Sequence, residues 1–423
     1  MKLVSVVCVA LLLFAGSIQG EEQARYDNYR LYRVQAKTLG QLNLLNQLDG
    51  SSDSLIFLKS ARTVGDNSLV IVAPHKFADF TAALERDGII AEVVQNNVQE
   101  SIDHESKRMA RRAKGDFNWT EYHELDEIHA WLDTLAAEHK EVETIEGGRS
   151  YENRLIKGVK VSYKSGNPGI FIEGGIHARE WISPATVTYI LNQLLTSQEP
   201  AVRKIAESYD WYIFPNANPD GYVYTHKKDR FWRKTRTPYG GACFGADPNR
   251  NWDFHWAEQG TSDRCASETY GGPQAFSEVE TKSLSEYITS LKGKIQAYIG
   301  FHSFSQLLLF PYGHTGEHVS NHDDLNAIAK ATIDSLAKRY GTRYVYGNVY
   351  DAIYPASGSS VDWAYGTLDV KIAYTYELRP DGSSAYGFEL PANQIVPTGE
   401  ETLDSLVTLI EESASRGYFK ESQ

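Results

Sequence analysis

The stretch Pro168-Gly-Ile-Phe-Ile-Glu-Gly-Gly-Ile-His177-Ala-Arg-Glu180 is the most informative feature of this chain. Its apolar part predicts a strand buried on both faces, as in parallel sheets. His177 and Glu180 follow directly, three residues apart, and one turn brings both to the same side, where they can reach one cation. Zinc in hydrolases commonly takes three nitrogen or oxygen ligands from the protein and leaves a fourth position for water.

A third ligand is offered by His302, which follows another apolar run, Gln296-Ala-Tyr-Ile-Gly-Phe301. Parallel sheets place their sites at the carboxyl ends of the strands, so two strand ends can bring these groups together. The sequence therefore predicts one zinc ion held by His177, Glu180 and His302.

From residue 117 onward, helical and strand patterns alternate. Continuous apolar or aromatic runs predict buried strands, and an amphipathic helix is expected near 125–135. Three polar signals predict helix starts. The strands are expected at 170–172, 211–214, 297–301 and 372–376, and the helix starts at Ser183-Pro184, Ser277 to Glu280 and Thr398 to Glu401. This predicts an α/β fold with a mixed, largely parallel central sheet and helices on both faces.

Residues 21–100 have the pattern of a small α+β unit. Strands are expected at 29–34, 68–73 and 89–94, and helices at 39–48 and 77–86. Residues 99–114 are almost without apolar side chains and end in a basic run. One interpretation is the solvated face of a basic helix. We favour an exposed connector, cut after Arg111 or Arg112 to release a propeptide.

Residues 1–20 predict a secretory signal, because Lys2 precedes an apolar run and small residues end at Gly20. The alternative is an N-terminal core strand or helix. The expected domains are therefore a signal at 1–20, a propeptide at 21–112 and a catalytic domain at 113–423. No later segment has the roughly eighteen consecutive apolar residues of a membrane span. The formal charge of −13 argues against a nucleic-acid partner.

A zinc peptidase needs more than metal ligands, and the chain offers the other groups. Glu377 ends an apolar strand and can act as general base. Arg233 can stabilise a developing oxyanion. Asn249-Arg250 offers a guanidinium fork and an amide for a free terminal carboxylate. By contrast, His314-Thr-Gly-Glu-His318 matches another zinc-peptidase pattern but is interrupted by glycine, so we expect a surface loop there.

Together these motifs resemble the secreted zinc metallocarboxypeptidases of the pancreatic carboxypeptidase A/B type. The resemblance covers nearly all the chain after the signal. It implies that His177, Glu180 and His302 are the zinc ligands, that Glu377 is the general base and that Arg233 stabilises the oxyanion.

The same resemblance assigns the residues that hold the substrate and support the metal. Asn249 and Arg250 match the pair that binds the terminal carboxylate, and Tyr354 matches the mobile tyrosine that closes on substrate. Arg179 matches an arginine that contacts the peptide further from the cut bond. Asp247 matches the aspartate that orients the first zinc histidine.

The specificity pocket is expected to be of the A type. Val361 stands where members that cut basic residues have an aspartate, and Val349 is another apolar wall position. Asp362 is expected to point away, and Gly313 to leave space near the entrance. A buried ammonium without a partner loses several kcal/mol of solvation, whereas an apolar side chain gains about 1.5–3 kcal/mol. Phe304, where the family often has tyrosine, and Ser359, where it often has glycine, depart from the pattern.

The cysteines fit a secreted protein. Cys8 leaves with the signal, and Cys243 and Cys265 remain as an even number outside the cell. The resemblance implies that these two are paired.

We therefore expect a secreted zymogen, in the digestive tract, that binds one Zn²⁺ and removes aromatic or aliphatic C-terminal residues from peptides. The expected partners are peptide or protein substrates and an activating trypsin-like protease, with no membrane or nucleic acid, and the chain is expected to be a monomer. The alternatives are a B-type enzyme that removes terminal Lys or Arg, a non-catalytic peptide-binding relative and a protein whose main role is inhibition by its N-terminal unit.

Overall fold

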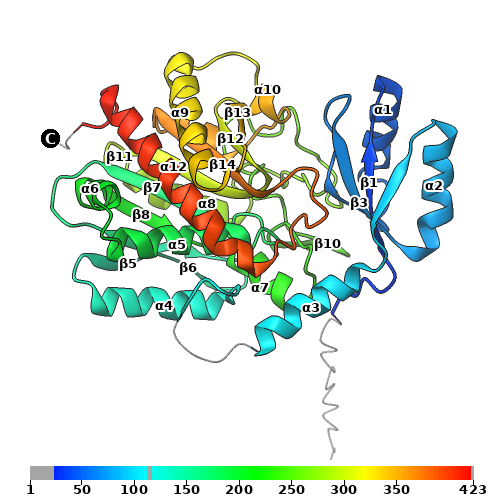
Figure 1. Cartoon of the computed structure of the whole chain (residues 1–423), viewed down its shortest axis with the longest axis horizontal. Helices are drawn as coiled ribbons and strands as arrows, with labels where there is room; N and C mark the ends of the chain where they lie inside the picture. The colour runs from blue at the N-terminus through cyan, green and yellow to red at the C-terminus, as the bar shows by residue number, and fades with distance from the viewer. Residues whose placement is uncertain (1–22, 112–116, 421–423) are drawn as a thin grey trace, which may run out of the picture.

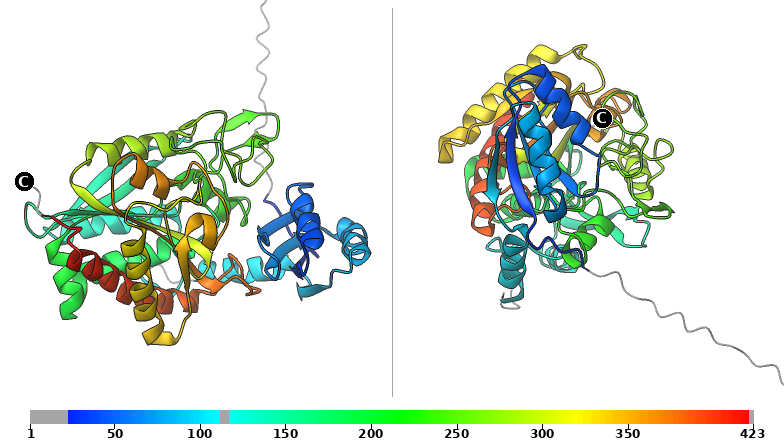
Figure 2. Two further views of the ribbon diagram at one scale, coloured as in Figure 1. Left: turned by 90° about the horizontal axis from the view of Figure 1, so that it is seen from above. Right: turned by 90° about the vertical axis from the view of Figure 1, so that its right-hand side faces the viewer.

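The structure is a computed structural model that describes residues 23–111 and 117–420. The expected signal, Cys8 and Arg112 lie outside these residues. The chain forms an N-terminal unit (residues 23–111) and a larger domain (residues 117–420), and the unit lies at one end of the larger domain (Figures 1 and 2). None of the helices in the described ranges is long and apolar enough to cross a bilayer.

The larger domain is built on an eight-stranded sheet with the order β13-β12-β14-β11-β7-β8-β6-β5. Its centre consists of four mutually parallel strands. On each side, the next strand, β12 or β6, runs antiparallel to this centre, which confirms a mixed α/β fold. The central strands are β14 (Ile372–Asp381), β11 (Ile295–Ser305), β7 (Gly169–Gly174) and β8 (Asp210–Phe214). The edge strands are β5 (Val142–Arg149), β6 (Leu155–Val161), β12 (Leu307–Phe310) and β13 (Val345–Asn348).

Helices cover both faces of this sheet, as expected. One face packs against α5 (Ile182–Thr196), α9 (His322–Tyr340) and α12 (Ile395–Ser415), where Tyr376 reaches Ser405 at 2.9 Å. The other face meets α8 (Val279–Ser290) and α11 (Ser360–Gly366). The remaining helices are α4 (Leu125–Glu138), α6 (Pro200–Ser208), α7 (Pro219–Lys227) and α10 (Val349–Ala352).

The three predicted helix starts are wrong by a few residues. Helix α5 begins at Ile182, before Ser183, because the Ser183 hydroxyl accepts from Gly175 N and donates to Phe301 O. Helix α8 begins after Ser277, whose hydroxyl donates to Glu278. Thr398 lies inside α12 and donates to the Gln394 carbonyl at 2.6 Å. In each case the hydroxyl has another partner, so it does not cap the helix.

The N-terminal unit has an antiparallel sheet with the order β2-β3-β1-β4 and three α-helices. The predicted strands and helices are present as β1 (Arg30–Gln35), β3 (Asn67–Val72), β4 (Ala91–Gln95), α1 (Leu39–Leu48) and α2 (Phe77–Arg86). Strand β2 (Leu55–Lys59) was not predicted. The expected connector is helical up to Arg111, as α3 (Val98–Arg111), because Val98 and Ile102 are buried on one side.

The N-terminal unit and the larger domain share a hydrophobic cluster. Tyr26 packs edge-on against Phe231, with ring centroids 5.2 Å apart. Its hydroxyl donates to Asp229 at 2.7 Å. The cluster comprises Tyr26, Leu31, Leu58, Leu69, Ile71, Val98, Ile102, Phe231, Phe304 and Phe388. The unit is therefore docked through a buried apolar contact.

Candidate metal centre and active site

The three predicted ligands meet at the carboxyl end of the central strands. His177 follows β7, Glu180 lies just before α5, and His302 is on β11. All three are buried, and one ligand atom from each lies within 4.8 Å of the others. Within the described residues, this is the one group of three such side chains that could hold a metal ion.

The distances between the ligand atoms fit zinc. The Nδ1 atoms of His177 and His302 lie 3.2 Å apart. Two nitrogens bound to a tetrahedral zinc at 2.0–2.1 Å would be about 3.3 Å apart. Glu180 places Oε1 2.7 Å from His177 Nδ1 and Oε2 3.4 Å from His302 Nδ1. Two imidazole nitrogens and one carboxylate therefore converge on one point, the donor set of a catalytic zinc site.

Asp247 fixes the orientation of His177. Its Oδ1 accepts from His177 Nε2 at 3.0 Å, which leaves Nδ1 free of a proton and available to a metal. Burial alone would raise the pKa of Asp247, but Arg233, His177 and Arg250 hold it well below its usual value. The carboxylate is therefore ionised, and it stabilises the tautomer that binds metal.

Glu377 lies beside the ligands on the neighbouring strand. It is the cross-strand partner of His302 in the pairing of β11 with β14. Burial raises the pKa of Glu377 to about 8, with a further increase from Glu180, while His302 lowers it. The charge of a bound zinc would lower it too, since a cation favours the carboxylate.

Arg233 brings a guanidinium to the edge of the metal site. Its Nη2 donates to Asp247 Oδ2 at 2.7 Å, and its Nη1 lies 3.7 Å from Glu180 Oε1. Burial alone would lower the pKa of Arg233, but Asp247 and Glu180 raise it above its ordinary value. A permanent positive charge therefore lies next to the ligand cluster.

The predicted carboxylate fork is also assembled. Arg250 donates to the carbonyls of Gly260 and Asn249 at 3.0 and 2.9 Å, which hold its guanidinium plane. Tyr354 brings its hydroxyl to 3.5 Å from Arg250 Nη2. Asn249 Oδ1 accepts from Ser360 N at 3.0 Å, so its amide is oriented by α11.

Arg179 lies close to these groups and is paired within the larger domain. Its Nη1 donates to Glu268 Oε2 at 2.8 Å and to Phe231 O at 3.2 Å. Its guanidinium lies over the Phe388 ring, 4.3 Å from the centroid. Sequence reasoning missed Glu268, because nothing in its local sequence marks it as a partner of Arg179. Phe304 packs against Phe388, with ring centroids 5.0 Å apart.

Val361 and Val349 are buried. Val361 follows Ser360, whose N–H donates to Asn249, and the Val349 carbonyl accepts from Tyr354 N at 3.2 Å, so both valines are close in sequence or by backbone contact to the fork. Asp362 does point away, as expected, since it accepts from the backbone N–H groups of Gly313 and His314 at 2.9 and 3.2 Å. Gly313 is closely packed, because a Cβ there would lie 2.7 Å from Ala356 O and 2.9 Å from Val349 Cγ1. The segment from His314 is a loop, but His314 itself is buried and bonded to Asp362, so it is not a surface residue.

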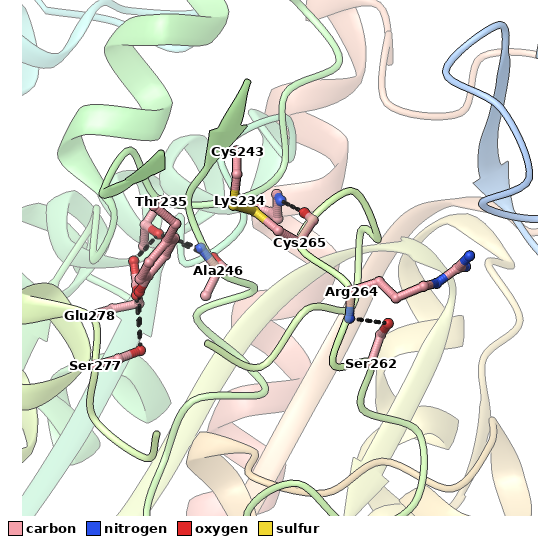
Figure 3. Close-up of a disulfide and its surroundings, with 10 residues drawn as sticks. Lys234, Thr235, Cys243, Ala246, Ser262, Arg264, Cys265, Ser277 and Glu278 are labelled. Atoms are coloured by element: carbon pink, nitrogen blue, oxygen red, sulfur yellow. Dashed lines mark hydrogen bonds between the residues drawn. A yellow bond between two sulfur atoms is a disulfide. The ribbon is translucent and has the colours of Figure 1, made fainter. Parts of the chain in front are cut away.

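The predicted disulfide joins Cys243 on β10 (Cys243–Phe244), which pairs with β9 (Pro238–Gly240), to Cys265 in the following loop. Figure 3 shows Lys234 beside it, donating to the Cys265 carbonyl at 2.6 Å. The Cα atoms of the cysteines are 5.8 Å apart. The bridge therefore ties down the segment that carries Asp247, Asn249 and Arg250.

A zinc-dependent hydrolase on a mixed α/β sheet is the class that this fold and site define. The family model for zinc carboxypeptidases matches residues 128–405, and the model for the carboxypeptidase activation peptide matches residues 32–105. The chain belongs to the zinc carboxypeptidase family, and it is an enzyme that carries an activation peptide.

Individual relatives agree with this assignment. The chain is 66% identical over 415 residues to zinc carboxypeptidase A 1 of Anopheles gambiae, covering 98% of this chain and 96% of that protein. It is 38% identical to carboxypeptidase A1 of Rattus norvegicus, covering 96% and 99%. The crystal structure of carboxypeptidase A from Helicoverpa armigera superposes with a TM-score of 0.84 at 28% identity, covering 93% and 99%.

Proposed function

We propose that this enzyme is a secreted zymogen that removes aromatic or aliphatic residues from the C-terminus of peptides. The observation that carries the preference is the apolar pair Val361 and Val349 together with the orientation of Asp362. With Asp362 bonded to the backbone, the position next to it offers no countercharge for a terminal Lys or Arg. Such a side chain would lose its solvation without compensation.

The chemistry follows from the positions of Glu377 and Arg233. His177, Glu180 and His302 would hold a zinc ion, which would supply a Lewis acid and lower the pKa of a water. Glu377 takes a proton from the attacking water and later passes it to the departing amine. Arg233 stabilises the negative charge that develops on the carbonyl oxygen, since its guanidinium is already held in place by Asp247.

The exopeptidase activity is assigned to the carboxylate fork. Arg250 and Asn249 bind the terminal carboxylate, and Tyr354 closes over it. Arg250 is buried and its plane is fixed, so it can form paired hydrogen bonds with a carboxylate at little entropic cost. Arg179 contacts the peptide further from the cut bond.

Latency is assigned to the N-terminal unit. Arg62 of this unit lies over the Tyr354 ring, 4.4 Å from the centroid, and so occupies the approach to the fork. Cleavage after Arg111 or Arg112 by a trypsin-like protease would release the propeptide, residues 21–112, from the catalytic domain, residues 113–423. Arg111 is exposed at the end of α3, which supports access by a protease. The disulfide supports secretion, because such bridges persist outside the cell. We infer that the enzyme acts in the digestive tract as a monomer.

The test uses the precursor before and after trypsin treatment, with blocked dipeptides ending in Phe, Leu, Lys or Arg. We expect negligible activity before cleavage. After cleavage, kcat/KM for Phe and Leu should exceed that for Lys by about 10²-fold or more, because several kcal/mol separate the two classes. Val361→Asp should shift the preference towards Lys. Faster release of Lys by the unmodified enzyme would favour the B type.

A further inference from the structure

Glu173 is a fully buried carboxylic acid that the mechanism above does not use. It lies on β7, four residues before His177, and has no exposed surface. Burying such a group costs free energy unless its oxygens have hydrogen-bond partners. Its presence in a strand that is otherwise apolar or glycine therefore requires an explanation.

The strand register places Glu173 directly behind the metal centre. Glu173, Gly300 and Thr375 form one row across three parallel strands. His302 and Glu377 form the row two residues further on, on the same face of the sheet. Two residues of a strand span about 7 Å, so Glu173 lies one side-chain layer below the reacting groups.

The contacts of Glu173 connect it to the specificity pocket. Ser360, which precedes Val361 in α11, donates to Glu173 Oε1 at 2.9 Å. Oε2 is buried and has no hydrogen bond of normal geometry within the described residues. Tyr298 Oη, which also lacks a bond of normal geometry in the residues described, makes a weaker hydrogen bond to the carboxyl.

Gly300 leaves room above the carboxyl. A Cβ at Gly300 would lie 3.4 Å from Glu173 Oε1 and 3.7 Å from Thr375 Oγ1, with no nearer atom outside its chain neighbours. These are ordinary van der Waals distances, so glycine leaves the volume of a methyl group free beside the carboxyl. The space is bounded by Glu173, Thr375 and His302.

We propose that Glu173 forms the deep end of the specificity pocket and accepts a hydrogen bond from a donor at the tip of the substrate's terminal side chain, the phenol of a terminal tyrosine. This inference rests on the proposed preference for aromatic termini. The valine walls suit an aromatic ring, and a single acceptor at the end suits a single hydroxyl. An ammonium carries three donors and is more costly to desolvate, and Ser360 already engages the other carboxyl oxygen.

The experiment measures kcat/KM of the trypsin-activated enzyme on blocked dipeptides ending in Tyr, Phe, 4-methoxyphenylalanine and Lys. A hydrogen bond in a buried site discriminates about tenfold, so we expect Tyr to exceed Phe by roughly that factor. The methoxy substrate, which has no donor, should fall below Phe. Glu173→Leu should lower kcat/KM for Tyr below that for Phe, since an unbonded phenol is penalised.

Two further variants keep the test decisive. Glu173→Gln retains an acceptor and should keep part of the Tyr preference, even if the leucine variant does not fold. Glu280→Gln is the matched control, because Glu280 is also buried with an unpartnered oxygen but belongs to α8 and bonds Tyr151 N. It should leave the Tyr-to-Phe ratio unchanged, and zinc content and Tm report folding for every variant.

The outcomes separate this inference from the proposed function. One outcome is that the unmodified enzyme has the same kcat/KM for terminal Phe and Tyr, and a much lower kcat/KM for Lys. This outcome would overturn the inference and leave the proposed function standing. An equal loss for Tyr and Phe in Glu173→Leu would make Glu173 a structural residue and overturn it too. Faster release of Lys than Phe by the unmodified enzyme would overturn the proposed preference, and loss of that Lys activity in Glu173→Leu would show that Glu173 binds an ammonium.

Discussion

The metal centre and the contact between the N-terminal unit and the larger domain are stabilised in different ways. At the metal centre, His177, Asp247 and Arg233 are bonded to one another inside the larger domain. At the contact, an apolar cluster is supplemented by a few polar bonds, such as that between Glu105 and Arg230 at 2.6 Å. The side chains of the centre are thus already assembled while the unit is still docked, so under the proposed latency activation needs only to expose them.

The largest effect is expected when one ligand of the metal centre is removed. His302→Ala should abolish zinc binding and lower kcat/KM by at least about 10³-fold, because two remaining ligands hold zinc poorly and the activated water is lost. Zinc content and dipeptide hydrolysis measure this. His139→Ala is the control, because His139 lies at the C-terminal end of α4 and is not part of the ligand cluster. Full zinc and activity in His302→Ala would mean that the metal is held elsewhere.

The next test separates metal binding from proton transfer. Glu377→Gln should keep zinc at one per chain and lower kcat by roughly 10²- to 10⁴-fold, since an amide cannot accept the proton. Metal analysis and turnover on the same sample measure both quantities. Near-normal turnover would assign the base to another group.

The contact between the N-terminal unit and the larger domain is tested by removing its buried ion pair. The side chains of Arg230 and Glu105 are 3% and 15% exposed. Glu105→Ala would leave the buried guanidinium without its charged partner. Breaking such a pair costs about 3–5 kcal/mol, although a released unit lets Arg230 recover water. We expect activity of the uncut precursor to rise ten- to a hundredfold. Glu100→Gln, an exposed carboxylate on the same helix, is the control, and an equal rise there would point to general loosening of α3.

A smaller effect is expected from pH at the same contact. Burial and the neighbouring Glu105 raise the pKa of Glu389 to about 8, and Arg230 and Ser101 oppose this. Because the pKa of Glu389 is higher in the docked state, protonation of this carboxyl stabilises docking. The stabilisation is complete below pH 4.5, the ordinary pKa of the group, and is lost as the pH rises to about 8. Between these two pKa values each pH unit changes the equilibrium about tenfold, so the nicked precursor should release its N-terminal unit about tenfold more readily at pH 7 than at pH 6.

This prediction is checked by comparing the nicked precursor with fully separated enzyme at each pH, so that the pH dependence of catalysis cancels. Glu389→Gln cannot ionise and should flatten the dependence. An unchanged slope in that variant would assign the effect to other groups.

The sequence predicted the sheet and the ligand cluster because both depend on strand ends. His177 and His302 come directly after buried apolar runs, so their side chains lie at the carboxyl ends of parallel strands. It did not predict the helix start at Ser183 correctly, since this hydroxyl bonds to Phe301 O, which only the fold brings near. The start at Thr398 was wrong for a local reason, because its hydroxyl bonds to the Gln394 carbonyl one turn back inside the helix. Glu173 lies within an apolar run without a local signal of its own, and its position below the metal centre depends on the register of three strands.

The pairing of His302 with Glu377 in adjacent central strands also bears on how the enzyme loses activity when heated. Central strands open only with the global unfolding of a domain, whereas loops open locally at low cost. A zinc ligand and the proposed base are therefore joined by the most stable part of the larger domain. Thermal inactivation at the metal centre should follow the unfolding of the whole sheet, and activity can be used to follow the folded fraction.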